Sequence, residues 1–259
     1  MRKKASSRLF LAVSSTDALS PSLLSLLSDA ERLKIEDISG RQRRNVYFCG
    51  RALLRLLLQT VTGLTANWHT ILTTDTGKPV CENGPGVSIS HSKGVIACAA
   101  AVDGDVGVDV EFTDLGRDTG RLATEYFSPT ENEWLSAQPQ NRFYMLWVLK
   151  EAWLKAVGTG IAGGIGHLQC RINPPCIDVR LDHPIHCRLN LFEMSGAYIG
   201  LAATDTRHRE VTVLQLNPGT HHLTGSTRLQ KVASGNSRGA ASVSKVSRSP
   251  GAPAANRRC

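Results

Sequence analysis

The chain carries, from residue 144 to residue 157, the stretch YMLWVLKEAWLKAV. Apolar residues recur in it at spacings of three and four, which predicts a helix with one face packed against a core. Trp147, Glu151 and Lys155 are each four residues apart, so they line a second face, roughly opposite the first at about 100° per residue. Gly158 follows, where a helix would end. The residues of the apolar face are Leu146, Leu149, Trp153 and Val157.

Two interpretations of the second face are open from this stretch alone. It is either the solvated side of an amphipathic helix, in which a Glu-to-Lys pair contributes about 0.3 kcal/mol, or a row that presents an indole, a carboxylate and an ammonium to a ligand. What the rest of the chain places beside the helix decides between them.

Length and composition allow a substantial core and locate the excess charge. The 259 residues suit one large domain or two small ones, and 41% of them are hydrophobic. The net charge is +8, yet no Asp or Glu occurs after residue 210, so the excess belongs to the C-terminal segment and the body is close to neutral. The basic residues of that segment are Arg228, Lys231, Arg238, Lys245, Arg248, Arg257 and Arg258.

The cysteines and the apolar runs indicate a compartment. Seven cysteines form no CxxC pair and no Cys/His cluster with zinc spacing, and an odd number in a long chain is typical of free thiols in a reducing compartment. No apolar run approaches the roughly 20 residues of a membrane-spanning helix. The basic start, MRKK, is followed by an apolar run too short for a signal peptide. We therefore expect a cytoplasmic protein without a membrane partner.

Local patterns predict an α+β chain. Residues 29–62 are expected to be largely helical, after a Ser28–Glu31 pair with capping-box spacing. Ser128 and Glu131 have the same spacing and start the second of two helical pieces. The strands expected outside the central region are 7–14, 95–102, 168–172, 177–181, 187–192, 197–203 and 211–216, and the two helical pieces lie within 121–138.

Strict alternation predicts a strand at residues 106–112, VGVDVEF. Its valines point to one side, so Gly107, Asp109 and Glu111 share the other. The two carboxylates then lie about 7 Å apart, because each residue advances a strand by roughly 3.3 Å. Such like charges are unfavourable unless a cation or a bound proton relieves them, and oxygen ligands without Cys or His suit Mg²⁺ or Mn²⁺. The alternative is a polar edge that faces solvent.

Basic residues upstream also allow two interpretations. Arg51 and Arg55 are four residues apart on the first predicted helix, and further arginines cluster at residues 41–44. They form either a solvated helix face or a clamp for phosphate groups. His91, within the stretch SISHSKG at residues 88–94, is either a structural histidine or a site residue.

An internal echo predicts two similar α+β halves. VIACAAAVD at residues 95–103 resembles YIGLAATD at residues 198–205, and each follows a long apolar helix. We expect halves 1–105 and 106–218, packed about a pseudo-twofold axis, with a ligand site in the cleft between them. From residue 219 onward Ser, Gly, Ala, Arg and Lys dominate, so residues 219–259 are expected to be a disordered basic tail.

Two motifs together resemble the signature of the 4′-phosphopantetheinyl transferase superfamily, a G-[IV]-D strand followed by a W-x-x-K-E-[AS]-x-x-K helix. Here they read GVDVE at residues 107–111 and WVLKEAWLK at residues 147–155. Other segments are similar to the longer, monomeric Sfp-type branch of that family. These are GRALL at 50–54, GKP at 77–79, ISHS at 89–92 and YFSPTE at 126–131.

The resemblance implies a pseudo-dimeric α+β fold, with coenzyme A between the halves. It implies an enzyme that moves the phosphopantetheine arm of coenzyme A to a serine of an apo acyl or peptidyl carrier protein and releases 3′,5′-ADP. Asp109, Glu111 and Glu151 would ligate one Mg²⁺, or Mn²⁺, which neutralises and orients the phosphoryl group under attack. Carriers of fatty-acid, polyketide and non-ribosomal peptide synthesis all remain open, and a monomer is expected.

The same resemblance implies roles for other polar residues. Glu151, directly or through a metal-bound water, is the expected base for the carrier serine, with Glu131 as a second candidate. Lys155 would stabilise or protonate the departing phosphate oxygen, and Lys150 would assist with phosphate. The residues that match nucleotide-binding positions are Arg51, Lys78 and His91, as a 3′-phosphate needs compact cations.

Three other functions compete with this one. A nuclease or phosphatase would use the same carboxylates without coenzyme A. A nucleic-acid-binding protein would use the basic C-terminal segment, but nucleic acid is not an expected partner because that segment has no Phe, Tyr or Trp to stack a base. An inactive relative is opposed by the intact Asp109, Glu111, Glu151 and Lys155.

Overall fold

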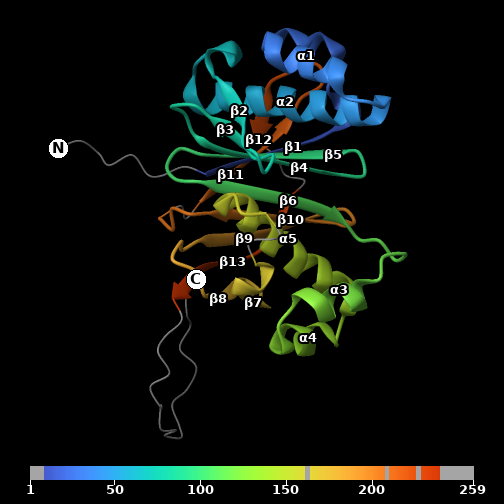
Figure 1. The fold of residues 1–259 in the computed structure, drawn as a ribbon, viewed down its shortest axis with the longest axis vertical. Coiled ribbons are helices and arrows are strands. Elements are labelled where there is room, and N and C mark those ends of the chain that lie inside the picture. The colour runs from blue at the N-terminus through green and yellow to red at the C-terminus, as the bar shows by residue number, and fades with distance from the viewer. Residues whose placement is uncertain (1–8, 161–163, 208–209, 226–228, 240–259) are drawn as a thin grey trace, which may run out of the picture.

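Two β-sheets and two long helices form the body of the chain in this computed structural model (Figure 1). The structure describes residues 9–160, 164–207, 210–225 and 229–239. The first sheet has five strands in the order β12-β11-β1-β5-β4, and the second has six in the order β6-β10-β9-β13-β8-β7. Strands β2 and β3 form a separate hairpin.

The elements have the following bounds. The first sheet contains β1 (Leu9–Ser15), β4 (Gly86–Ser92), β5 (Val95–Ala101), β11 (Val211–Leu216) and β12 (Leu223–Gly225). The second contains β6 (Val106–Phe112), β7 (Leu168–Asn173), β8 (Cys176–Leu181), β9 (Arg188–Met194), β10 (Ala197–Ala203) and β13 (Gln230–Gly239). The hairpin is β2 (Ile71–Thr73) and β3 (Pro79–Cys81). The helices are α1 (Asp29–Asp37), α2 (Arg41–Thr62), α3 (Thr119–Tyr126), α4 (Pro129–Leu135) and α5 (Pro139–Val157). Short 3₁₀ turns are η1 (Thr16–Ala18), η2 (Pro21–Leu26), η3 (Ala66–Trp68) and η5 (Ile165–His167).

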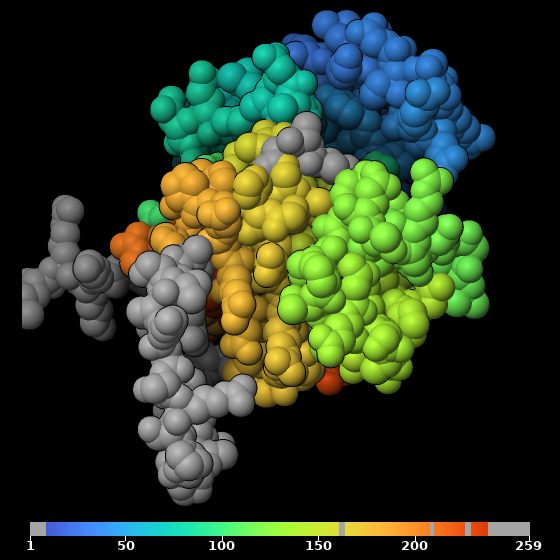
Figure 2. Space-filling view, turned by 60° about the horizontal axis from the view of Figure 1, so that its bottom comes forward, coloured from blue at the N-terminus to red at the C-terminus, as the bar shows by residue number. Residues whose placement is uncertain are grey.

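The two sheets pack face to face, and each carries one long helix on its outer face (Figure 1). Strand alternation explains this layering: Leu9 and Leu11 of β1 join Val108 of β6 in the apolar layer between the sheets. The residues of β1 between them face the other way, toward α2. On the second sheet α5 covers the outer face. In Figure 2 the blue-to-teal residues, from α1 to β3, therefore form one part of the surface and the green-to-orange residues the other.

The same unit of strand, helix and hairpin occurs twice. It is first built from β1, α2, β4 and β5, and then from β6, α5, β9 and β10. In each unit the last strand lies between the first strand and its hairpin partner, so the strands that carry the echoed sequence, β5 and β10, occupy equivalent places. The predicted α+β fold of two similar halves is confirmed.

Most predicted elements are present. Strand β6 has the predicted bounds, and both capping boxes occur, Ser28–Glu31 on α1 and Ser128–Glu131 on α4. The five short strands expected after residue 167 are β7 to β11. The predicted helical region 29–62 is divided into α1 and α2 just before Gly40, which has a φ of 90°.

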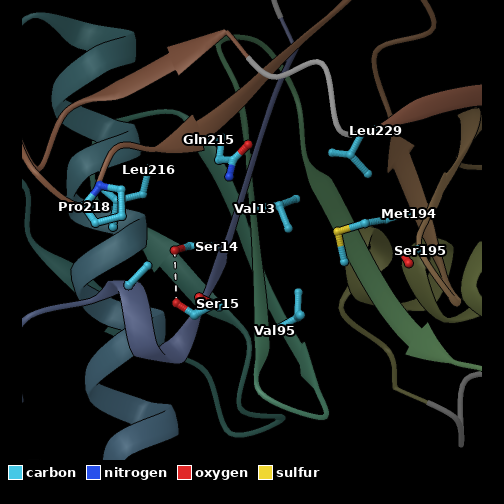
Figure 3. Close-up of a pocket in the computed structure, with 11 residues that line it drawn as sticks. Val13, Ser14, Ser15, Val95, Met194, Ser195, Gln215, Leu216, Pro218 and Leu229 are labelled. Atoms are coloured by element: carbon cyan, nitrogen blue, oxygen red, sulfur yellow. Dashed lines mark hydrogen bonds between the residues drawn. The ribbon is translucent and has the colours of Figure 1, made fainter.

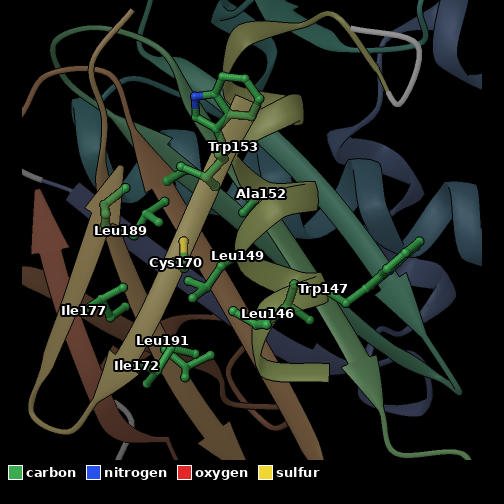
Figure 4. Close-up of a cluster of buried hydrophobic side chains, with 14 of the residues drawn as sticks. Leu146, Trp147, Leu149, Ala152, Trp153, Cys170, Ile172, Ile177, Leu189 and Leu191 are labelled. Carbon is green, nitrogen blue, oxygen red and sulfur yellow. The ribbon is translucent and has the colours of Figure 1, made fainter. Parts of the chain in front are cut away.

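The amphipathic view of α5 is wrong. Leu146, Leu149 and Trp153 are buried as expected, and Figure 4 shows them in one cluster with strands β7, β8 and β9. However, Trp147 is only 7% exposed and belongs to the same cluster, stacked on Phe143 with ring centroids 5.5 Å apart. The helix is therefore surrounded on most sides, and its indole is a core side chain and not one presented to solvent.

The predicted disordered tail is wrong for its first part. Residues 223–225 form β12, and residues 230–239 form β13, which pairs with β9 on one side and β8 on the other. Polar composition did not prevent this, because a strand between two others gains backbone hydrogen bonds on both edges whatever its side chains. Strand β11, which lies within the expected second half, pairs in parallel with β1 of the first half. Residues 240–259 lie outside the described residues.

Two predictions from composition can also be compared with the structure. Cys176 is disulfide-bonded, contrary to the expectation of free thiols throughout. Among the described residues, no helix combines the length and apolarity needed to cross a bilayer. The buried free thiols are Cys49, Cys81, Cys98, Cys170 and Cys187.

Candidate active site

Two glycines let α5 lie directly on the second sheet. A Cβ at Gly107 of β6 would overlap the carbonyl oxygen of Ala152 and the amide nitrogen of Ala156, and a Cβ at Gly200 of β10 would overlap the carbonyl of Val148. Only residues without a side chain permit so close an approach. Because Gly107 shares a strand face with Asp109, the same approach carries the next turn of α5 toward that carboxylate.

Four predicted site residues meet between β6 and α5. The Lys155 ammonium lies 2.7 Å from Oδ1 of the buried Asp109. Burial, and then the negative charge of Asp109, raise the pKa of Glu151, while Lys155 opposes this. Burial and Asp109 likewise raise the pKa of Glu111. The charge of Asp109 thus disfavours the ionisation of both Glu111 and Glu151.

Two serines of β4, in the first half, hold the carboxylates of the second. Ser90 Oγ donates to Asp109 Oδ1 at 2.8 Å, and Ser92 Oγ donates to Glu111 Oε2 at 3.2 Å. Arg117 adds a contact to Glu111 Oε1 at 3.5 Å, and its guanidinium lies 4.8 Å from the centre of the Trp147 ring. Sequence reasoning did not single out these three residues. The two-residue spacing of Ser90 and Ser92, which equals that of the carboxylates, was the available signal.

The donor chemistry of this cluster fits a magnesium ion. Asp109 Oδ2 and Glu151 Oε1 are buried and have no hydrogen-bond partner, although buried carboxylate oxygens are normally satisfied. All the donors are oxygens, which Mg²⁺ prefers. Within the described ranges no group of three His, Cys, Asp or Glu side chains is already arranged around a common point. Asp109 is engaged by Lys155, and Glu111 by Arg117.

The three residues expected at the nucleotide end lie on different elements. Lys78, before β3, donates to the carbonyl of Ala156 at 2.6 Å and so sits at the C-terminal end of α5. His91, exposed on β4, has its pKa lowered by partial burial and then by Lys155, which places it beside the carboxylate cluster. Arg51 is buried on α2, where Nη2 donates to Thr73 Oγ1 at 2.9 Å and Nη1 has no hydrogen-bond partner.

Glu131 and Lys150 are placed elsewhere, which corrects their predicted roles. Their charged groups are 3.0 Å apart, with both side chains almost fully buried. Glu131 also accepts the amide of Cys170 at 2.9 Å, and Lys150 donates to the carbonyls of Ile165 and Leu168. The pair thus joins α4 and α5 to η5 and β7. Neither residue is available as a base or a phosphate contact.

The arginines of the first predicted helix lie in different environments. Arg55 is buried, with Nε 2.6 Å from Glu31 Oε2 and Nη1 bonded to the carbonyls of Ala66 and His69. It is therefore neither a solvated residue nor a phosphate clamp. The cluster at residues 41–44 is exposed at the start of α2.

A cavity of about 520 Å³ lies elsewhere between the sheets (Figure 3). It is lined by Val13 and Ser15 of β1, Gln215 of β11 and Met194 of β9. None of these strands is β4 or β6, and no side chain that lines it is charged at neutral pH. The carboxylate cluster and this cavity are therefore separate features of the interface between the sheets.

Comparison with known proteins identifies the family of this chain. Residues 105–198 match the model of the 4′-phosphopantetheinyl transferase superfamily. The 4′-phosphopantetheinyl transferase of Bacillus subtilis is 30% identical over 157 residues, which cover 58% of this chain and 68% of the relative. The chain belongs to the 4′-phosphopantetheinyl transferase superfamily. Within that superfamily, HetI of Nostoc sp. is 31% identical over 54% of this chain and 63% of its own length, and pptA of Paxillus involutus is 26% identical over 78% and 88%.

The coverage of these phosphopantetheinyl transferase relatives is partial. The chain covers 63% of HetI of Nostoc sp., 64% of the relative slr0495 of Synechocystis sp. and 66% of psf-1 of Bacillus pumilus. The superfamily match at residues 105–198 contains β6 and α5 and ends at the start of β10. It therefore includes Gly107 and the four residues that meet between β6 and α5, whereas Gly200 lies just beyond it.

Proposed function

We propose that this chain transfers the 4′-phosphopantetheine arm of coenzyme A to a serine of an apo acyl or peptidyl carrier protein. The serine oxygen forms a bond to the β-phosphorus, the bond from that phosphorus to the bridging oxygen breaks, and 3′,5′-ADP leaves. The observation that carries the proposal is the meeting of Asp109, Glu111, Glu151 and Lys155 between β6 and α5, in a member of this superfamily.

The residues of the cluster have distinct roles in this proposal. Asp109, Glu111 and Glu151 hold one Mg²⁺, with Mn²⁺ as a substitute. When bound, the metal neutralises charge on the phosphoryl group and orients it. Glu151 accepts the proton of the carrier serine. Lys155, one helical turn on, stabilises the departing phosphate oxygen.

The nucleotide end of coenzyme A is bound by cations around the cluster. His91 lies on β4 beside Lys155, and Lys78 lies at the end of α5. The unpartnered Nη1 of Arg51 is a further donor. We place the 3′-phosphate among these groups, because compact positive donors are what a phosphate monoester needs. The division between the two halves after residue 105, the monomeric state and the cytoplasmic location belong to the same proposal.

One experiment tests the reaction. The full chain is incubated with coenzyme A, Mg²⁺ and a panel of apo carrier proteins, and the intact mass of each carrier is measured. We expect a gain of one phosphopantetheine arm that disappears with a chelator and with Asp109→Ala. Hydrolysis of a generic phosphoester or of nucleic acid, with no arm transferred to any carrier, would replace this function by that of a phosphatase or nuclease.

A further inference from the structure

The seam between β4 and β6 is joined by serine side chains. Val108 and Val110 of β6 donate their backbone N–H groups to Ser88 Oγ at 3.1 Å and to Ser90 Oγ at 3.4 Å. Both serines are buried and lie two residues apart, so they share one face of β4. Hydroxyl groups thus take the place of carbonyl acceptors where the two halves meet edge to edge.

Ser90 has a second set of contacts that Ser88 lacks. The Lys155 ammonium donates to Ser90 Oγ at 3.0 Å, and Ser90 Oγ donates to Asp109 Oδ1 at 2.8 Å. A hydroxyl offers one donor and two acceptor sites. Because the ammonium and the backbone N–H can only donate, the single hydroxyl hydrogen is directed at Asp109. All three hydrogen-bonding positions of Ser90 are then in use.

These contacts fix how the Asp109 carboxylate is turned. Oδ1 accepts from both Ser90 and Lys155, whereas Oδ2 is buried and without a hydrogen-bond partner. A carboxylate held by one oxygen presents the other in a defined direction. Ser92 makes the same kind of contact to Glu111 Oε2, one pleat further along β4.

We propose that Ser90 is a positioning residue of the first half, which orients Asp109 of the second half so that Oδ2 is presented to the divalent cation. This rests on the proposed magnesium-dependent function, and it goes beyond it by making metal affinity depend on the seam between the halves. Hydrogen-bond partners of metal ligands commonly contribute tenfold to a hundredfold to affinity. Ser90 acts through Asp109 and needs no contact of its own with the metal.

The test compares two serines that differ in one respect. Ser90→Ala and Ser88→Ala each remove a buried hydroxyl that accepts from β6, but only Ser90 touches a carboxylate. Binding of Mn²⁺ and Mg²⁺ alone to the full chain is measured by calorimetry, and thermal unfolding is measured with a chelator. We expect Ser90→Ala to weaken metal binding about tenfold or more, Ser88→Ala to change it less than about twofold, and both to lower the melting temperature. Ser90→Thr, which keeps the hydroxyl, should restore most of the affinity.

The outcomes separate this proposal from the proposed function. Metal binding that is unchanged in Ser90→Ala, or weakened equally in Ser88→Ala, overturns the positioning role while leaving the transferase reaction intact. If Ser90→Ala weakens metal binding but the wild-type chain transfers no arm to any carrier, the reaction is overturned and the positioning role is kept. A wild-type chain that binds neither Mg²⁺ nor Mn²⁺ overturns both.

Discussion

At the scale of single residues, the carboxylate cluster is arranged at the expense of stability. The pKa of Glu111 is raised by burial first and then by the charge of Asp109. An unfolded Glu has a pKa of about 4.3, so Glu111 stabilises the fold at pH values below that and loses this contribution as the pH rises through its raised pKa. Glu111→Gln cannot ionise. In the presence of a chelator, this variant should therefore have a higher melting temperature than the wild type at pH 7, and the difference should become smaller toward pH 4.

The control for this experiment is Glu133→Gln, at an exposed position on α4. It should show no such trend with pH. Melting curves at several pH values decide the matter. If Glu111→Gln raises the melting temperature equally at pH 4 and pH 7, the ionisation of Glu111 does not destabilise the fold.

His91 offers a prediction about ligand binding. Its pKa is lowered by burial and by Lys155, and an approaching phosphate would raise it again. His91→Ala should weaken coenzyme A binding about tenfold at pH 6, less at pH 8, and should change 3′-dephospho-coenzyme A binding little. Calorimetric titrations of both ligands give the comparison. The matched control is Lys93→Ala, an exposed cation two residues on that pairs with Asp114. Equal losses for the two ligands would contradict contact with the 3′-phosphate.

Sequence patterns identified the charged residues of the cluster but not their supports. Asp109 and Glu111 follow from strand alternation, which is a local property. Ser90 and Arg117 matter because β4 and the segment after β6 lie beside those carboxylates. The spacing of Ser90 and Ser92 matches that of the carboxylates, but spacing alone does not state that β4 and β6 are neighbours. Glu131 shows the converse: its capping-box spacing allowed a cap or a site residue, and the structure uses the cap and a buried pair with Lys150.

At the scale of elements, the packing of α5 on β6 depends on Gly107. Gly107→Ala would force the new methyl group into the backbone of α5 at Ala152 and Ala156. Overpacking of this kind costs about 1–3 kcal/mol, and a backbone clash should place the variant at or above the upper end. Urea unfolding measures the loss, and metal affinity should fall with it because Lys155 and Glu151 move away from Asp109. Gly166→Ala, with open space around the position, is the control.

Elements were predictable where the pattern is local, and their partners were not. The alternation in residues 211–216 predicts a strand, and β11 is present. The same alternation does not state that its neighbour is β1, some two hundred residues earlier in the chain. For α5 the helical period was correct, but the depth of its burial depends on α3, α4 and the strands of the second sheet that pack around it. This is why Trp147 was assigned to the wrong environment.

At the scale of the whole molecule, the C-terminal segment is part of the fold. A stop after Pro218 removes β12 and the inner strand β13, so we expect a loss of several kcal/mol. Since 1 kcal/mol corresponds to about 2–4 °C for a domain of this size, the melting temperature should fall by at least roughly 10 °C. Circular dichroism melting provides the measurement. A stop after Gly239 keeps every described strand and should melt within a few degrees of the full chain. Equal melting temperatures for the two truncated chains would mean that β13 does not contribute to the stability of the fold.

The overall architecture was predictable because the repeated unit leaves a trace in the sequence, the echo between β5 and β10. The C-terminal strands were not, because residues 230–239 contain only two apolar side chains, Val232 and Ala233. Their pairing comes from the backbone of β8 and β9, whose edges are separated by the width of one strand. Composition indicates how much apolar surface a segment can bury, but it does not indicate which strands the backbone of that segment will pair with.

The place of β13 has a consequence for the chain while it is being translated. The second sheet stays divided until residue 239 has left the ribosome, because β8 and β9 have no strand between them before then. The first sheet is likewise incomplete until β11 pairs with the edge of β1. A nascent or stalled chain that ends before residue 230 presents open strand edges to other chains, which is a hazard for aggregation. Neither sheet is therefore complete until the strands after residue 210 have been synthesised.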